Sequence, residues 1–336
     1  MTSAESLILG IETSCDETSV SVLAHGSDIR SNVVASQADL HRRFGGVVPE
    51  LASRQHLERL LPVMDEALEI AGVGLEELTA VAVTQGPGLV GALTVGVAAA
   101  KALALSRDLA LVGVNHLEGH LYGAWLAAPD LVFPALALIV SGAHTDVVVM
   151  HDHGHYEVLG RTRDDAAGEA FDKVARAMGL GYPGGPELDR LARGGDPRAV
   201  ALPLPMADES LEFSFSGIKT AALRVLATAS RTAQFDADFA ASLQRVIVDV
   251  LVVKTMRAAL RAGVSTVLVV GGVAANSRLR EEMDRACRHA GVRLVVPPLA
   301  LCTDNAAMIA AAGYQRLGRG LRADLHLGAS SDLALA

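Results

Sequence analysis

One pattern occurs twice in the 336-residue chain, as LILGIETSCDETSVSVL at residues 7–23 and as LALIVSGAHTDVVVM at residues 136–150. Each copy has an apolar, strand-like run, a short turn of small polar residues and a second apolar run. This pattern predicts a β-hairpin. Because the pattern recurs, we expect an internal duplication that gives two lobes of similar topology.

Helical and strand-like segments alternate outside these hairpins. Helical patterns occupy residues 51–71 and 89–105, and short apolar strands are expected at residues 79–84 and 110–115. A further strand–turn–helix unit is expected at residues 265–286. Such alternation predicts an α/β protein with mostly parallel central sheets and helices packed on their faces.

The composition excludes several classes of protein. Hydrophobic residues make up 51% of the chain and charged residues 20%, so the chain can bury a large core and is not disordered. The net charge of −9 argues against coating nucleic acid through bulk charge, and the 4% aromatic content argues against a base-stacking platform. The three cysteines show no CxxC spacing, which fits a reducing compartment.

The ends of the chain and its most apolar stretch bear on its location. The N-terminal residues MTSAESLILGIETS lack the basic region and long apolar run of a signal peptide. The apolar stretch at residues 89–105 is short for a membrane span and contains Lys101. We therefore expect a cytoplasmic protein without a membrane segment, whose last dozen residues form a loose tail.

The segment NHLEGH, residues 115–120, carries the sharpest chemical signal. His116 and His120 are four residues apart, so on a helix both imidazoles lie on one face and can share a metal ion. Two unrelated surface histidines are the alternative. The zinc-protease motif H-E-x-x-H is excluded, because Glu118 lies roughly 200° around the helix from His116 and cannot act as that family's general base.

A third ligand is needed, since two imidazoles alone bind metal poorly. The best candidate by residue type is Asp304, in LCTDNAAMIAAAG at residues 301–313. Two histidines and one carboxylate leave open coordination positions, as in non-haem iron and catalytic zinc sites. The alternative is that Asp304 only favours the first turn of a helix that Thr303 caps.

Glycine-rich turns follow two of the expected strands. VSGAHT at residues 140–145 bends at Ser141 and Gly142 and can present backbone N–H groups to a phosphate or acyl oxygen. VVGGVAANSRLRE at residues 269–281 opens a helix, where Asn276 offers an amide for base or ribose contacts. Each turn also has a purely structural explanation. Four carboxylates in polar, loop-rich segments are further candidates to accept hydrogen bonds from ribose hydroxyls: Asp164, Asp165, Asp172 and Asp189. The alternative is that they are acids that face solvent.

Taken in order along the chain, these pieces resemble the TsaD family of tRNA threonylcarbamoyltransferases. The motifs that carry the resemblance are ILGIETSCDETSVSV, GGVVPELASRQH, TQGPGLVGALTVG, VNHLEGH, VSGAHT, GEAFDKVARAMGLGYPGGPELD, FSFSGIKTA, VVGGVAANSRLR and CTDNAAM. The likeness is collinear from about residue 7 to residue 325, and the first hairpin is similar to that of the bacterial branch.

The resemblance implies a fold and its division. The family shares the two-lobed architecture of actin, hexokinase and the large heat-shock ATPases (the ASKHA fold), with duplicated βαβ subdomains. We therefore expect an N-terminal lobe, residues 1–130 with about 302–336, that carries the metal site. A C-terminal lobe of residues 131–301 is expected to carry the adenylate-binding turns.

The resemblance also implies a reaction and the residues that serve it. Threonylcarbamoyl-AMP donates its threonylcarbamoyl group to N6 of adenosine 37, next to the anticodon, in tRNAs reading codons that begin with adenine. His116, His120 and Asp304 match the metal ligands, with one iron(II) ion per chain and zinc as the alternative. The positions that match the adenylate-binding residues are Ile139, Val140, Ser141, Gly142, Ala143, Asp172, Gly185, Asp189 and Asn276.

One position departs from the family pattern. The family turn is usually SGGHT, and Ala143 here replaces its second glycine. If that residue needs a positive φ, alanine costs about 1 kcal/mol. If only its N–H group matters, nothing is lost.

A tRNA-modifying enzyme with a charge of −9 needs a local arginine patch or help from partners. The resemblance implies four partners: tRNA, a paralogous non-catalytic protein (TsaB-like), a small ATPase (TsaE-like) and a donor-forming enzyme (TsaC/Sua-like). We expect the small-residue helix at residues 89–105 to form part of a partner face. Candidate arginines for tRNA are Arg42, Arg43, Arg54, Arg59, Arg161 and Arg163.

The residue pattern identifies no general base. Polar candidates near the expected turns are Glu12, Asp16, His144 and Lys219.

Other functions are compatible with the same architecture. A sugar or acid kinase, or a small-molecule O-carbamoyltransferase, would keep the fold without tRNA, and the histidine pair favours carbamoyl transfer because such kinases use magnesium and carboxylates. A non-enzymatic alternative is an inactive paralogue that serves as a scaffold. The presence of His116, His120 and Asp304 argues against it.

Overall fold

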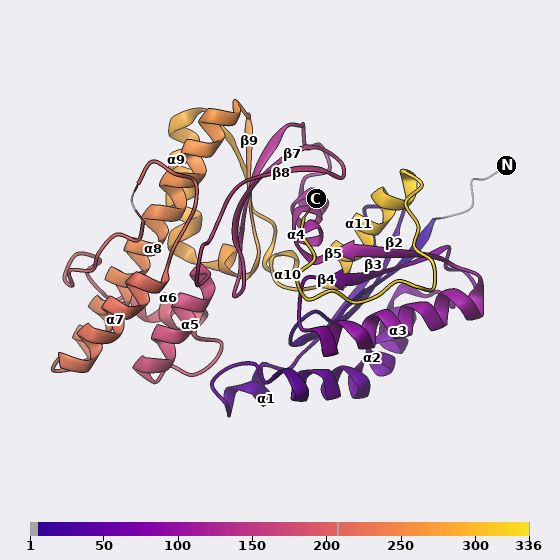
Figure 1. Cartoon of the computed structure of the whole chain (residues 1–336), viewed down its shortest axis with the longest axis horizontal. Coiled ribbons are helices and arrows are strands. Elements are labelled where there is room, and N and C mark those ends of the chain that lie inside the picture. The colour runs from indigo at the N-terminus through magenta and orange to yellow at the C-terminus, as the bar shows by residue number, and fades with distance from the viewer. Residues whose placement is uncertain (1–5, 207, 336) are drawn as a thin grey trace. The chain divides into compact units, whose positions relative to one another are not determined.

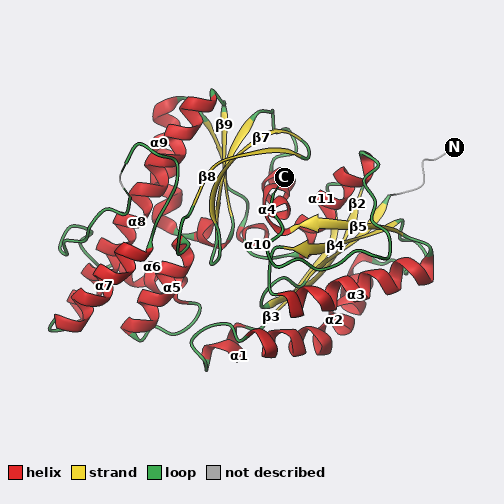
Figure 2. Cartoon of the chain, in the orientation of Figure 1, coloured by secondary structure: helices red, strands yellow, loops and turns green. Residues whose placement is uncertain are grey.

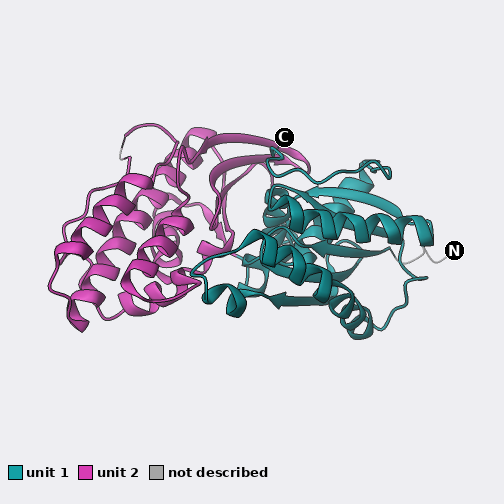
Figure 3. Cartoon of the chain, turned by 60° about the horizontal axis from the view of Figure 1, so that its bottom comes forward, with its two compact units in different colours: residues 1–130, 297–336 teal, residues 131–296 magenta. Residues whose placement is uncertain are grey.

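The computed structural model describes residues 6–206 and 208–335. The chain divides into two compact units, Met1–Asp130 with Pro297–Ala336 and Leu131–Val296 (Figure 3). The chain thus leaves the first unit once and returns to it near its end. The return falls at Pro297, whereas the sequence placed it at about residue 302.

A five-stranded sheet forms the centre of the first unit (Figure 1). Its strands are β1 (Leu7–Glu12), β2 (Glu17–Ala24), β3 (Asp28–Ser36), β4 (Ala80–Gly86) and β5 (Ala110–Asn115). Their order across the sheet is β3-β2-β1-β4-β5. Strands β1 and β2 form the expected antiparallel hairpin, while β1 pairs parallel with β4 and β4 pairs parallel with β5.

The helices of this unit cover both faces of the sheet (Figure 2). They are α1 (Ala38–Arg42), α2 (Pro49–Ala71), α3 (Val90–Arg107), α4 (His116–Ala127), α10 (Leu299–Cys302) and α11 (Ala306–Gly318).

Side-chain alternation on β1 decides which helices cover which face. Leu9 and Ile11 belong to an apolar core to which α2 and α3 also contribute. On the other face, a Cβ on Gly10 would lie 2.3 Å from the carbonyl oxygen of Ala306, so α11 packs directly on the strand. The missing side chain at Gly10 therefore brings the start of α11 close to the sheet.

The second unit repeats this sheet. Its strands are β6 (Ala135–Val140), β7 (Thr145–Asp152), β8 (His155–Arg161), β9 (Thr266–Val270) and β10 (Arg293–Val295). Their order is β10-β9-β6-β7-β8, with antiparallel pairing of β6 to β7 and of β7 to β8 and parallel pairing of β6 to β9 and of β9 to β10. The predicted internal duplication is confirmed at the level of strand order and direction.

Helices of the second unit come mainly from the segment between β8 and β9. The elements are α5 (Ala167–Met178), α6 (Gly184–Ala192), α7 (Ser216–Thr228), α8 (Ala233–Ala262), the 3₁₀ helix η1 (Gly272–Ala275) and α9 (Ser277–Ala290). The 30-residue helix α8 had no counterpart in the sequence-based prediction, because it is buried on most sides and shows no amphipathic stripe.

The C-terminal segment and helix α3 both pack against the first unit. The prediction of a loose C-terminal tail is wrong, because the Ser330 amide donates to the Gln85 carbonyl oxygen (2.9 Å) and Asn115 Nδ2 donates to the Leu333 carbonyl oxygen (3.1 Å). By length and composition alone, helix α3 could cross a membrane. Core helices of globular proteins meet the same two criteria. Gly96 of α3 packs inward, since a Cβ there would lie 2.5 Å from Thr13 Oγ1.

Candidate metal centre and glycine-rich turns

The paired histidines lie at the start of helix α4, directly after strand β5. Asn115 ends the strand and caps the helix, its Oδ1 accepting a hydrogen bond from the Leu117 amide (2.9 Å). His116 and His120 follow one turn apart on the helix, with ring centroids 4.7 Å from each other. The predicted arrangement on one helix face is what the structure shows.

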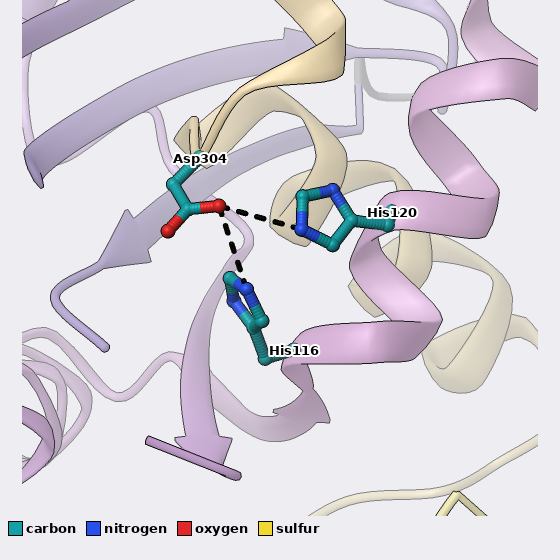
Figure 4. Close-up of side chains that lie close together, drawn as sticks. All are labelled: His116, His120 and Asp304. Carbon is teal, nitrogen blue, oxygen red and sulfur yellow. Dashed lines mark ion pairs between the residues drawn. The ribbon is translucent and has the colours of Figure 1, made fainter. Parts of the chain in front are cut away.

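Asp304 reaches the same place from the far end of the chain (Figure 4). Its Oδ1 lies 3.5 Å from His116 Nε2 and 3.3 Å from His120 Nε2. Ligand atoms of the three residues all lie within 4.8 Å of one another. The alternative role of Asp304 in a helix capped by Thr303 is wrong, because α11 begins later and Asn305 caps it by accepting from the Met308 amide (3.1 Å).

The His120 ring gives an observation that bears directly on metal binding. Both of its nitrogens are buried and neither forms a well-aligned hydrogen bond with a described residue, although Asp304 Oδ1 lies 3.3 Å from Nε2. A buried polar atom without a partner costs about 1–3 kcal/mol. A metal ion at Nε2 would supply the missing partner, so the residues present fit a divalent metal. The side chain of Asp304 is 21% exposed, against 8% for His116 and 0% for His120, which leaves the carboxylate side open to further ligands.

Burial and charge together set the pKa values at this cluster. Burial alone would lower the pKa of His116, but the carboxylates of Asp304 and Glu12 outweigh it and raise that pKa well above its usual range. Burial would raise the pKa of Asp304, yet the neighbouring His116 holds it well below its usual range. Both shifts favour a protonated His116 between two carboxylates, so a metal ion at this cluster would have to displace a proton.

Glu12 is the buried partner of His116 on the side away from Asp304. Its Oε2 lies 2.9 Å from His116 Nδ1 and also accepts a hydrogen bond from Thr84 Oγ1 (2.7 Å). Ser14 Oγ lies 3.2 Å from the same imidazole nitrogen. The sequence offered Glu12 only as a general-base candidate, and Thr84 and Ser14 were missed. Their signal is their position at or just beyond the carboxyl ends of β1 and β4, where α/β proteins place functional groups.

Glu118 lies outside this cluster. Its side chain is buried and forms an ion pair with Arg316 at 2.9 Å. The carboxylate between the two histidines in sequence therefore serves a helix–helix contact, as the exclusion of the protease motif anticipates.

The turn at residues 141–144 is closed by hydrogen bonds among its own residues. The Ser141 amide donates to the His144 carbonyl oxygen (2.8 Å), and Ser141 Oγ accepts from the amides of Ala143 (3.3 Å) and His144 (3.1 Å). The turn itself therefore uses the Ser141 amide. Ala143 has a negative φ, so its replacement of the usual glycine carries no strain in the backbone.

The other expected adenylate-binding positions form a connected set around helix α6. Asp172 Oδ1 accepts from the amides of Gly184 (2.9 Å) and Gly185 (3.1 Å) and so caps this helix. One turn further along, Asp189 Oδ1 accepts from Ser277 Oγ (2.7 Å), next to Asn276. Asn276 in turn caps α9 by accepting from the Leu279 amide.

The end of strand β6 is the remaining part of the expected adenylate site, and Gly271 packs against its backbone. The Ile139 and Val140 side chains are fully buried, so only their backbone is available to a ligand. Gly271 has φ 93°, and a Cβ there would lie 2.4 Å from the Val140 carbonyl oxygen. The glycine at this turn is therefore explained by its close approach to the backbone of β6.

Solved structures with the same fold define the class of protein. HypF from T. kodakarensis matches with a TM-score of 0.63 at 15% identity, covering 95% of this chain and 48% of HypF. Component A of the (R)-2-hydroxyglutaryl-CoA dehydratase of Acidaminococcus fermentans matches with a TM-score of 0.53 at 17% identity, covering 94% of this chain and all of that one. A glucokinase of the ROK family from Streptomyces griseus matches with a TM-score of 0.51 at 11% identity, covering 92% of this chain and 98% of the glucokinase. The expected actin/hexokinase-like (ASKHA) fold is confirmed.

Sequence comparison narrows this class to one family. The family model for TsaD, tRNA N6-adenosine threonylcarbamoyltransferase, matches residues 28–311. Proteins of that name from Symbiobacterium thermophilum and Geobacillus thermodenitrificans are 58% and 56% identical, covering 99% and 98% of this chain and 98% and 96% of theirs. The chain belongs to the TsaD family.

Proposed function

We propose that this chain is the transferase that forms N6-threonylcarbamoyladenosine at position 37 of tRNAs reading codons that begin with adenine. The observation that carries the proposal is the buried His116, His120 and Asp304 cluster in a chain that belongs to the TsaD family. In the reaction a bond forms between N6 of adenosine and the carbamoyl carbon of threonylcarbamoyl-AMP. The bond from that carbon to the phosphate oxygen breaks, AMP leaves and one proton is released.

The three residues of the cluster would hold one metal ion, iron(II), with zinc as the alternative. A bound metal ion acts as a Lewis acid that polarises donor oxygens and offsets the negative charge developing in the transition state. Two imidazoles and one carboxylate leave coordination positions open, which suits such a role. The chain's own contribution is to keep His116 oriented through Glu12 and to exclude water from His120, which is fully buried.

The adenylate of the donor is proposed to bind in the second unit. Ile139 to Ala143 would contribute backbone groups, and the set around α6 would contribute polar ones. Asp189 and Asn276 are both nearly buried and already fixed by hydrogen bonds, so they are ordered before a ligand arrives. The residues of this proposed donor site are Ile139, Val140, Ser141, Gly142, Ala143, Asp172, Gly185, Asp189 and Asn276.

Partners and location complete the proposal. The chain would act in the cytoplasm on tRNA together with a TsaB-like paralogue and a TsaE-like ATPase, and receive its donor from a TsaC/Sua-like enzyme. The exposed side of helix α3, which includes Val90 and Leu105, is the part of the α3 surface proposed to meet a partner.

The decisive experiment is transfer of labelled threonine to unmodified tRNA by the purified chain with iron(II), the donor-forming enzyme and the partner proteins. We expect label on adenosine with the wild-type chain and none with His116→Ala. Glu118→Gln is the matched control, because it also alters a buried group on α4, a carboxylate that pairs with Arg316. A wild-type chain that transfers no label, with the donor shown to be present, would overturn the tRNA assignment and leave carbamoyl transfer to a small molecule.

A further inference from the structure

A turn between α1 and α2 presents an aromatic ring and a guanidinium group to solvent. Phe44 is 51% exposed and is the one aromatic among the exposed large hydrophobic residues of the described chain. The adjacent Arg43 is also exposed, and its side chain forms no ion pair or hydrogen bond with any described residue. An exposed aromatic is unusual in a chain with so few aromatics, and here it stands beside an unpaired positive charge.

Hydrogen bonds to His41 fix the conformation of this turn. His41 is fully buried, and its carbonyl oxygen accepts hydrogen bonds from the amides of Phe44 (2.9 Å) and Gly46 (3.4 Å). Its ring Nδ1 accepts from the Val48 amide (3.3 Å), and its Nε2 lies 3.1 Å from Gln37 Oε1. A ligand that binds here meets an ordered surface, which reduces the entropy lost on binding.

The same framework continues to the metal cluster. The Gln37 amide donates to the carbonyl oxygen of Asp16 (2.9 Å), which lies in the four-residue turn between β1 and β2. In that turn Ser14 Oγ lies 3.2 Å from His116 Nδ1. Hydrogen bonds therefore connect the exposed turn to a proposed metal ligand within one unit of the fold.

The surroundings of Phe44 favour a nucleic acid over a protein as its partner. Its neighbours in the turn are Arg42, which pairs with Asp39 (3.0 Å), Arg43, whose positive charge is unpaired, and Gly45 and Gly46, which have no side chains. A protein-docking site would need a wider apolar patch around the ring. An unpaired base needs only a ring face to stack on and a cation for its phosphate.

We propose that Phe44 and Arg43 form a contact site for the anticodon loop of the tRNA substrate. Phe44 stacks on an unpaired base of the loop, and Arg43 pairs with a backbone phosphate. The inference rests on the proposed function, because it is that function which makes tRNA the substrate. It assigns an RNA contact to two residues that lie outside the metal cluster and the proposed donor site.

The test is the affinity of the intact chain, with its partner proteins, for a fluorescent anticodon stem-loop, measured by anisotropy. Phe44→Ala should weaken binding about 5- to 100-fold, and Phe44→Tyr should retain wild-type affinity because tyrosine stacks equally well. Arg43→Ala should reduce the slope of log affinity against log salt by about 0.7, as expected for one lost contact to single-stranded RNA. Leu61→Ala, which removes another exposed side chain (64%) on α2, is the control and should change nothing.

Two further arms make the outcome unambiguous. A duplex of the same stem without its loop should bind wild type and Phe44→Ala equally, since stacking requires an unpaired base. If Phe44→Ala binds the stem-loop with wild-type affinity, the proposal is overturned. That holds also if the variant is found to bind a protein partner less well. Loop binding that depends on Phe44 in a chain that transfers no threonine label would instead support the contact and overturn the proposed function.

Discussion

The two units have the same sheet and differ in what stands at the ends of its strands. Strand β1 ends on Glu12 and β6, its counterpart, ends on Val140. Strand β5 is followed at once by His116, whereas β10 is followed by Val296 and Pro297. In both units the central hairpin is closed by a four-residue turn, Thr13–Asp16 in the first and Ser141–His144 in the second.

This difference separates the requirements of folding from those of chemistry. Buried charges are costly unless they are paired, and the first unit carries buried Glu12, His116 and His120 at one edge of its sheet. At the corresponding strand ends, the second unit has backbone groups and a glycine, Gly271, in place of buried charges. The topology thus tolerates either solution, and the polar one occurs where a metal would be held.

The largest effect is expected from removing a proposed metal ligand in the first unit. His120→Ala should abolish stoichiometric metal binding and reduce tRNA modification by about a thousandfold or more, because several kcal/mol of charge stabilisation are lost. Metal content after dialysis and single-turnover transfer measure the two losses. Asp189→Ala in the second unit is the comparison: it should keep the metal and raise the KM for the donor. Loss of metal in that variant would contradict the division of roles.

Glu12→Gln should come next in size. It removes the charge that orients His116 while keeping a similar shape, and loss of such a partner typically weakens metal affinity about 10- to 100-fold. Cobalt(II) titration followed by absorbance reads the site directly, without relying on turnover. Glu118→Gln, also a buried carboxylate in this unit, should leave the titration unchanged. Equal cobalt(II) affinities of wild type and Glu12→Gln would show that Glu12 has only a structural role.

Glycines at comparable elements should differ in their tolerance of a methyl group. Gly10→Ala places a Cβ 2.3 Å from the Ala306 carbonyl oxygen and should cost about 1–3 kcal/mol of unfolding free energy, as overpacking does. Gly142→Ala, in the hairpin turn of the second unit, meets nothing within 4 Å and should stay within about 0.5 kcal/mol of wild type. Denaturant unfolding monitors both. Similar losses at the two positions would mean that α11 does not depend on Gly10 for its approach.

The smallest effect concerns an acid that serves the fold of the second unit. Asp164 accepts hydrogen bonds from the amides of Phe215 (2.8 Å) and Ser216 (3.2 Å) at the start of α7, so Asp164→Ala should cost about 1 kcal/mol. Burial would raise the pKa of Asp164, but bonds from the Ser214 and Ser216 hydroxyls outweigh it and lower that pKa.

The pH dependence of this difference follows from the sign of the shift. Because the pKa is lower in the folded chain, the contribution is present above the unfolded value of about 3.9 and is lost as the pH falls through the folded pKa. The stability gap between wild type and Asp164→Ala should therefore be constant from neutral pH down to about pH 5 and narrow below it. A gap that widens in acid would contradict this origin.

Most of the fold and the histidine pair of the proposed metal site could be predicted from residues alone. Hairpins, parallel strands and the His116–His120 pair all depend on local periodicity, and periodicity is written in consecutive residues. The ordered resemblance of nine motifs then identified the family and supplied the residues of the proposed donor site. Helix α8 escaped because a helix buried on most sides lacks the stripe that marks amphipathic helices.

Other features were decided only by the tertiary structure. Asp304 was a candidate by residue type, but its approach to His116 across nearly two hundred positions depends on α11 packing against Gly10. The tail was expected to be loose because its composition is loop-like, yet Asn115 binds its backbone. Ser141 turns its amide inward through a bond to His144 that no local pattern announces. Local sequence determines which element forms, whereas contacts between distant residues form only after the chain has packed, and they fix the partner of each polar group.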